Sequence, residues 1–135
     1  MTQNPAPVHN NPDVLALIDR ALQEDLSIGD PTTEALIHRD LQGEGVLRSK
    51  AQGVLCGGEI IQAVFWRIDP TLICSLFLMD GAPLAPGDLI ARVQGSVGSI
   101  LKGERTALNF LQHLSGTATG TARYVQAARG LKARI

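Results

Sequence analysis

The sequence predicts a small α+β domain, and three observations support this prediction. The 135 residues are 44% apolar with a formal net charge of −1, which is typical of a globular chain with a core of its own. Apolar residues recur at helical spacing near both ends of the chain. Between them, segments of period two alternate with turns and one helical stripe. The order helix, strand, helix, strand, turn, strand is typical of an α+β layer.

The composition excludes several classes of function. Basic residues are interleaved with acidic ones and aromatic residues make up only 4%, so the chain has no electrostatic footprint for nucleic acid. No apolar run reaches the ~20 residues of a membrane-spanning helix. The start, MTQNPAPVHNNP, lacks the apolar centre of a signal peptide. We therefore expect a cytoplasmic protein without nucleic-acid or membrane partners. Cys56 and Cys74 stand alone in apolar surroundings, which indicates reduced packing residues.

The first predicted element is a helix over residues 12–25. Residues 1–11 are polar and rich in proline and asparagine, which indicates a flexible leader. Asn11 then supplies an N-cap and Pro12 suits the first helical position. Apolar residues follow at helical spacing, at Val14, Leu15, Ile18 and Leu22.

A short second helix is predicted after a turn in LSIGDPTTEALI. Gly29 allows the turn, and Pro31 disfavours helical geometry at Asp30. We expect a hydroxyl of Thr32 or Thr33 to cap this helix.

The middle of the chain predicts three strands and a helix. Alternation from Gly43 predicts a half-buried strand that reaches a turn at GVLCGG. An apolar stripe predicts a helix over 59–68, and Asp69-Pro70 ends it. TLICSLFLMD and LAPGDLIARVQG predict two further strands. In the second of these, Pro86 and Gly87 suit the central positions of a type II turn.

The last part predicts a helix from Ser99 with two different faces. Ala107, Phe110, Leu111 and Leu114 form its apolar stripe, while Arg105, Asn109 and Gln112 lie on a polar face. The small residues of SGTATGTA allow either the close approach of another backbone or a break in the helix. A second helical piece is expected to end at Gly130, a left-handed cap. The alternation in LKARI then indicates the start of a strand, either one entering a βα repeat or a terminal strand of the same sheet.

Most candidate sites have a simpler structural explanation. Glu24, Asp25 and Asp30 are acidic, but carboxylates at a helix end and turn are more often a solvated surface. The three histidines share no spacing that favours one metal, so we predict no metal site. Gly57 and Gly58 lack the lysine of a phosphate-binding loop and are expected to start a helix or permit close packing.

Arg105 is the one candidate ligand-binding residue. A guanidinium near a helix start opposes the macrodipole, and Glu104 beside it allows a plain surface ion pair. Its planar fork of donors also matches a carboxylate or phosphate with two parallel hydrogen bonds. The spacing alone leaves these two interpretations about equal.

Four segments resemble the amino-terminal half of the quinolinate phosphoribosyltransferase family: EDLSIGDPTTEALI, GVLCGGEII, GAPLAPGDLIARVQGSVGSIL and ERTALNFLQHLSGTAT. The resemblance covers residues 12–135 in unbroken order, and the block around Arg105 is its most specific part. Local departures stand at Gly103, where alanine is usual, and at Thr117 and Gly120, where larger apolar residues are usual.

The resemblance implies both a fold and a reaction. The fold is a small, hammerhead-like α/β sandwich with a four-stranded, mostly antiparallel sheet, followed by an incomplete α/β barrel. The reaction converts quinolinate and phosphoribosyl pyrophosphate, with Mg²⁺, to nicotinate mononucleotide, pyrophosphate and carbon dioxide in de novo NAD biosynthesis. The resemblance assigns Arg105 to substrate binding, reaching a quinolinate carboxylate in the barrel of a homodimer partner.

The resemblance also implies a division of the chain. Residues 1–11 would be the leader, 12–114 the sandwich domain with its helices, and 115–135 the connecting helix and start of the barrel. The family's catalytic residues would follow Ile135, so we expect none within these residues and no activity from this chain alone. Two alternatives remain: a biotinyl or lipoyl carrier hairpin at GAPLAPGDLIARVQG, and a non-catalytic dimerisation module.

Overall fold

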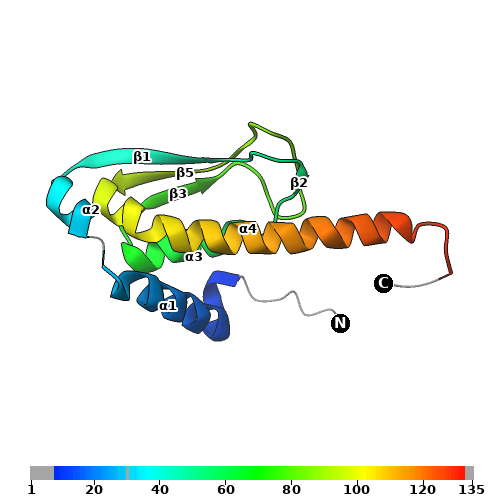
Figure 1. The fold of residues 1–135 in the computed structure, drawn as a ribbon, viewed down its shortest axis with the longest axis horizontal. Coiled ribbons are helices and arrows are strands. Elements are labelled where there is room, and N and C mark those ends of the chain that lie inside the picture. Colours follow the sequence, from blue (N-terminus) through cyan, green and yellow to red (C-terminus); the bar gives the residue numbers. More distant parts are fainter. Residues whose placement is uncertain (1–7, 30, 133–135) are drawn as a thin grey trace.

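The computed structural model describes residues 8–29 and 31–132 as an α+β fold (Figure 1). Figure 1 shows a sheet that covers α3 and α4, with α1 on the far side of these helices. The elements are η1 (Val8–Asn10), α1 (Pro12–Ser27), α2 (Pro31–Leu36), β1 (Gln42–Arg48), β2 (Gly53–Val54), α3 (Gly58–Ile68), β3 (Ile73–Leu76), β4 (Pro83–Leu84), β5 (Leu89–Ser96) and α4 (Val97–Ala127).

The strands form two antiparallel sheets, so the expected single four-stranded sheet is wrong. The larger sheet has the order β1-β5-β3, and a separate two-stranded sheet pairs β2 with β4. An irregularity in register between Leu47 and Arg48 ends the regular pairing of β1 with β5. The chain then turns toward α4, and Gly53 pairs with Leu84 instead of extending the larger sheet.

Helix α1 confirms the predicted capping. The Asn11 side chain accepts hydrogen bonds from the N–H groups of Asp13 at 3.0 Å and Val14 at 3.5 Å. The helix runs two residues beyond the predicted end and buries Ile18 and Leu22. Part of the expected leader is ordered, because Val8–Asn10 form a helical turn and the Val8 N–H donates to Glu59 Oε2 at 3.0 Å. The rest of that leader, residues 1–7, lies outside the described residues.

Helix α2 exists, but the expected threonine cap is wrong. The helix begins at Pro31, so Thr32 and Thr33 lie inside its first turn. The fixed φ of proline suits the first helical position, so the helix begins before either threonine. Asp30 lies outside the described residues.

Helix α3 agrees with the prediction apart from one additional residue, but the strand after it is shorter. Only Ile73–Leu76 of TLICSLFLMD form β3. The segment then turns, with the Ala82 N–H donating to the Met79 carbonyl, and this turn carries Asp80 back to the start of α3. The type II turn is confirmed: Gly87 has φ +92°, and the Asp88 N–H donates to the Ala85 carbonyl at 3.1 Å.

Helix α4 is one continuous element of 31 residues, so the predicted break within SGTATGTA does not occur. The alternative, a close backbone approach, is confirmed. Thr119 Oγ1 accepts from the Val54 N–H at 2.9 Å, and a Cβ added to Gly53 would lie 2.6 Å from the same oxygen. The expected boundary between residues 114 and 115 therefore falls inside an unbroken helix.

The end of α4 confirms the predicted cap but not the start of the strand. Gly130 has φ +86°, the left-handed conformation that follows many helices. Leu131 and Lys132 form a bend. The remaining residues of the expected strand, 133–135, lie outside the described residues.

The core lies between the larger sheet and the two long helices. Ile61, Val64 and Phe65 of α3 meet Ala107 and Leu111 of α4, and Ala91 and Val93 of β5 close the other side. Gly103 belongs to this contact, since an added Cβ would lie 3.0 Å from Phe65 Cδ1. The glycine at this position therefore permits the close packing of α4 on α3.

Both cysteines are free thiols, as predicted. Burial raises the pKa of Cys74 to about 11. Burial, and then the nearby Asp80 carboxylate, raise the pKa of Cys56. Both thiols thus remain protonated and unreactive at neutral pH. None of the helices in the described part of the chain is long and apolar enough to cross a membrane.

Candidate functional site

The amino-terminal half of α4 has a buried side and an exposed side. Ser96 caps the helix, and its hydroxyl accepts from the Ser99 N–H at 3.4 Å. Gly103, Thr106 and Ala107 are buried against the rest of the domain. Arg105 lies on the other side and is exposed. Since α4 begins at Val97, Arg105 lies more than two turns inside the helix, where the unfavourable dipole at the helix start has little effect.

Arg105 lines a cleft of about 790 Å³ between α4 and the segment that joins α1 to α2. We call this the Arg105 cleft. One wall runs from the end of α1 to α2 and consists of Asp25, Leu26, Ile28, Gly29 and Glu34. The other wall is formed by α4, with Leu101, Lys102, Glu104, Arg105, Leu108, Asn109 and Gln112. The polar row predicted from the sequence, Arg105 with Asn109 and Gln112, is therefore gathered on one wall.

The Arg105 guanidinium makes no hydrogen bond or ion pair with any described residue. The ion pairs among these residues are Arg67 with Asp19, Arg92 with Glu44, and a histidine–aspartate contact at His38. Glu104, the expected surface partner, is not among them. The donors of Arg105 can thus serve an anion that comes from outside the described residues.

Asp25 departs from the prediction of a purely solvated acidic surface. Its Oδ2 accepts a hydrogen bond of 2.5 Å from Thr106 Oγ1. Thr106 is only 1% exposed, so this bond satisfies a hydroxyl that has been removed from water. Glu24 is exposed as expected, and Asp30 lies outside the described residues. No local pattern links Asp25 to Thr106, because 81 residues separate them.

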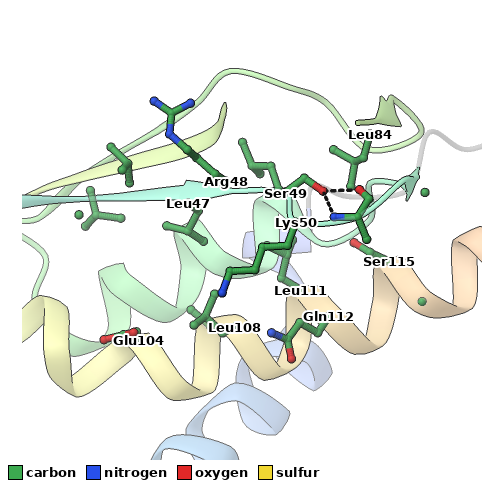
Figure 2. Close-up of a pocket in the computed structure, with 18 of the residues that line it drawn as sticks. Leu47, Arg48, Ser49, Lys50, Leu84, Glu104, Leu108, Leu111, Gln112 and Ser115 are labelled. Atoms are coloured by element: carbon green, nitrogen blue, oxygen red, sulfur yellow. Dashed lines mark hydrogen bonds between the residues drawn. The ribbon is translucent and has the colours of Figure 1, made fainter. Parts of the chain in front are cut away.

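A second groove of about 930 Å³ runs between β1 and α4 (Figure 2). Leu47, Leu84 and Leu111 give it an apolar lining. Figure 2 shows the Lys50 side chain over this groove, with its amine directed toward Leu108 on α4. Leu101, Glu104, Leu108 and Gln112 line both this groove and the Arg105 cleft, so they form the ridge between them. This groove has no signal in the sequence, because it arises only when β1 and α4 come together.

The paired glycines start α3, as predicted, and their donors are occupied. Gly57 has φ +108°, and an added Cβ would lie 3.0 Å from Leu114 Cδ1. The N–H groups of Gly57 and Gly58 each donate to one oxygen of Asp80 at 2.9 Å. The chain's own carboxylate therefore takes the place that a phosphate takes in a phosphate-binding loop.

The structure argues against the carrier hairpin. In a carrier, the two strands on either side of the turn pair with each other. Here β4 pairs with β2, whereas β5 pairs with β1 and β3. The turn between β4 and β5, residues 85–88, also holds no lysine.

Comparison with known families gives one family for most of the chain. Residues 30–115 match the model described as "Quinolinate phosphoribosyl transferase, N-terminal domain". A tobacco protein named quinolinate phosphoribosyltransferase [decarboxylating] 1b is 36% identical over 123 residues, which are 90% of this chain and 35% of that protein. A Synechocystis protein named probable nicotinate-nucleotide pyrophosphorylase [carboxylating] is 34% identical over 132 residues, 94% of this chain and 44% of its own length.

Solved structures show the same fold. NadC from Streptococcus pyogenes superposes with a TM-score of 0.81 at 40% identity, covering 85% of this chain and 42% of that one. The nicotinate-nucleotide pyrophosphorylase from Francisella tularensis superposes with a TM-score of 0.80 at 29% identity, covering 94% of this chain and 46% of that one. The chain thus spans between 35% and 46% of the length of these relatives.

Proposed function

The chain belongs to the quinolinate phosphoribosyl transferase family, whose N-terminal domain it matches. We propose that it forms part of a decarboxylating phosphoribosyltransferase of NAD biosynthesis. The proposed reaction converts quinolinate and phosphoribosyl pyrophosphate to nicotinate mononucleotide, pyrophosphate and carbon dioxide. The names of the relatives support it, since they specify quinolinate, decarboxylation and the nicotinate nucleotide. The whole protein would then be a glycosyltransferase of the pentosyltransferase class.

In this proposal Arg105 binds a carboxylate of quinolinate. The observation that supports it is the exposed guanidinium on the wall of the Arg105 cleft, without an ionic partner among the described residues. A dianionic pyridine needs paired cationic donors to leave water and to be held in register for reaction. Arginine meets a carboxylate with two parallel hydrogen bonds, a geometry that lysine does not offer.

We further propose that Arg105 serves a site completed by a second copy of the protein. In this proposal the chain supplies substrate-binding residues, and the catalytic residues belong to the part of the relatives that it does not span, since it covers less than half of each. A homodimer with shared sites would bring Arg105 to the catalytic residues of its partner.

A hybrid enzyme tests this role. Residues 12–132 of this chain replace the matching part of NadC from Streptococcus pyogenes, chosen for its 40% identity. We expect nicotinate mononucleotide formation by the hybrid, and a rise of about 100-fold or more in the quinolinate KM for Arg105→Ala, as for the loss of a buried bidentate charge pair. Arg105→Lys should recover only part of this loss. An unchanged KM in Arg105→Ala would refute the assignment.

A non-catalytic dimerisation module is the second candidate. The second half of α4 favours it, because Tyr124 is 74% exposed and Val125 45% exposed there. In this case Arg105 would form an ion pair across the interface. Sedimentation of Arg105→Ala separates the two candidates, since substrate binding requires an intact dimer with a raised KM, whereas the structural role requires dissociation.

Magnesium, in this proposal, enters with phosphoribosyl pyrophosphate and is held by residues outside this chain. Residues 8–29 and 31–132 contain no group of three His, Cys, Asp or Glu side chains that could hold a metal ion. No step assigned to these residues depends on the metal.

A further inference from the structure

Thr106 stands out because it combines burial with polarity directly beside Arg105. Among the described residues it is the one polar side chain classed as buried. Its hydroxyl donates to Asp25 Oδ2 at 2.5 Å, which joins α4 to the last turns of α1. Asp25 is half-buried and also lines the Arg105 cleft. Thr106 itself does not line the cleft, but this hydrogen bond connects the two helices that carry its walls.

The other buried residues in this part of α4 lie on different sides and make apolar contacts, while the Ser99 hydroxyl, near the helix start, donates to Asp69 Oδ2 at 2.8 Å. Gly103 packs on Phe65, while Ala107 and Leu111 enter the core beneath the sheet. Apolar contacts of this kind are not directional. On the side toward α1, the Thr106–Asp25 hydrogen bond adds a directional contact with a narrow range of distance and angle.

We propose that Asp25 and Thr106 are positioning residues that hold the end of α1 against α4 and so fix the width of the Arg105 cleft. This inference rests on the proposed function, which makes an anionic pyridine carboxylate the ligand of that cleft. Asp25 does not bind this anion itself, because two carboxylates repel each other. Thr106 does not reach it, because its hydroxyl is buried and already bonded to Asp25.

Kinetics of the hybrid enzyme provide the first test. Thr106→Val keeps the shape of the side chain but removes the donor, and Asp25→Ala removes the acceptor. We expect each to raise the quinolinate KM about three- to tenfold, the equivalent of one net hydrogen bond, with kcat within about twofold. Thr106→Ser keeps the hydroxyl and should restore the KM. A merely structural loss would lower the active fraction, and hence kcat, without this pattern.

Asp19→Ala is the matched control. Asp19 also lies on α1 and also joins this helix to another, by its ion pair with Arg67 of α3, but it does not line the cleft. We expect Asp19→Ala to leave the quinolinate KM unchanged. An equal rise in KM for Asp19→Ala and Asp25→Ala would overturn the inference, because any loosening of α1 would then suffice.

Arg105→Ala separates failure of this inference from failure of the proposed function. If Arg105→Ala raises KM but Thr106→Val does not, the positioning role is wrong and the proposed function stands. If neither changes KM, both are wrong.

Amide hydrogen exchange on the 135-residue chain is the second readout and needs no activity. Thr106→Val and Asp25→Ala should speed exchange in residues 22–28 and 101–109, whereas Thr106→Ser and Asp19→Ala should leave 101–109 as in the parent chain. Unchanged exchange in both segments for Thr106→Val would overturn the inference, whatever the hybrid shows.

Discussion

Asp80 lies at the start of α3 and accepts from the N–H groups of Gly57 and Gly58, although it is 23 and 22 positions from them in the sequence. Its two oxygens satisfy donors that a helix start leaves without partners inside the helix. The negative charge also lies at the favourable end of the helix dipole. Asp80 thus replaces the capping side chain that glycine at the N-cap cannot provide.

We expect Asp80→Ala to lower the free energy of unfolding by about 1–2 kcal/mol, the usual value of an N-cap side chain. Urea unfolding followed by circular dichroism measures the change. Asp40→Ala is the control, since the exposed Asp40 carboxylate accepts no hydrogen bond from a helix N–H among the described residues, and this variant should stay within about 0.5 kcal/mol. Equal stability of the two variants would show that the Asp80 contacts contribute nothing measurable.

Asp69 gives the protein a defined sensitivity to acid. Its carboxylate accepts hydrogen bonds from the Thr71 hydroxyl at 2.6 Å, the Thr71 N–H at 2.9 Å and the Ser99 hydroxyl at 2.8 Å, and these lower its pKa from the ordinary 3.8. Because the folded-state pKa lies below the unfolded one, the stabilising contribution is complete above the unfolded pKa. It is lost as the pH falls through the folded pKa.

Asp69→Asn should therefore flatten the loss of stability in acid. We expect the free energy of unfolding of the parent chain to fall more steeply below about pH 4 than that of Asp69→Asn. Thermal unfolding between pH 2.5 and 7, at steps of about 0.5, measures both slopes. If the free energies of unfolding of the two proteins fell in parallel with pH, Asp69 would not be the source of this acid sensitivity.

At the scale of elements, α4 supplies hydrogen-bond partners to a segment that has few of its own. The two residues of β2 pair only with β4. Thr119 Oγ1 accepts from the Val54 N–H, and Ser115 Oγ accepts from the Cys56 N–H at 3.0 Å. The small side chains of α4 let the backbone of β2 approach closely enough for these bonds. Small residues here serve the domain's own packing.

Thr119→Val should lower the free energy of unfolding by about 1–3 kcal/mol, because the part-buried Val54 N–H loses its acceptor. Thr117→Val is a closely matched control on the same helix. The Thr117 hydroxyl is exposed and donates only to the His113 carbonyl of its own helix, so this variant should change stability by less than about 0.5 kcal/mol. Chemical unfolding of both variants measures these changes. Similar losses in the free energy of unfolding would show that the contact with β2 does not stabilise the fold.

At the scale of the whole molecule, the proposed function assigns substrate binding to this chain and catalysis to residues outside it. We expect the purified chain alone, prepared free of host enzyme, to form no nicotinate mononucleotide from quinolinate, phosphoribosyl pyrophosphate and Mg²⁺. Separation of the products by chromatography measures this, with the hybrid enzyme as the positive control. Turnover by the chain alone would refute the division of roles proposed here.

The fold was predictable where its causes are local. Asn11 with Pro12 fixes the start of α1, and Pro86-Gly87 fixes a turn, because each acts through its own backbone or the next residues. The separate sheet of β2 and β4 was not predictable, since two residues form a strand there only through contact with a helix more than sixty positions away. The continuity of α4 through Gly116 had no local signal either, since Ser115 and Thr119 on either side of it bond to the segment around β2, and such tertiary contacts override intrinsic propensity.

The site was predictable in part and for a different reason. The helical period placed Arg105, Asn109 and Gln112 on one face, which the cleft confirms. The role of Arg105 came from a family resemblance, since spacing alone left an ordinary surface ion pair equally possible. The bond between Asp25 and Thr106 had no local signal, because neither residue lies in a pattern that refers to the other.

The unbroken course of α4 has one more consequence. Arg105 and Ala127 belong to the same helix, so the angle between them about its axis is set by the number of residues that separate them. Inserting a single alanine after Gly120 would turn Ala127 by about 100° relative to Arg105, while seven inserted residues would return it to within about 20° of its original bearing. In the hybrid enzyme, the single insertion should rotate everything attached beyond the helix away from its original direction relative to Arg105. The seven-residue insertion should nearly keep that direction and only lengthen the helix, by about 10 Å.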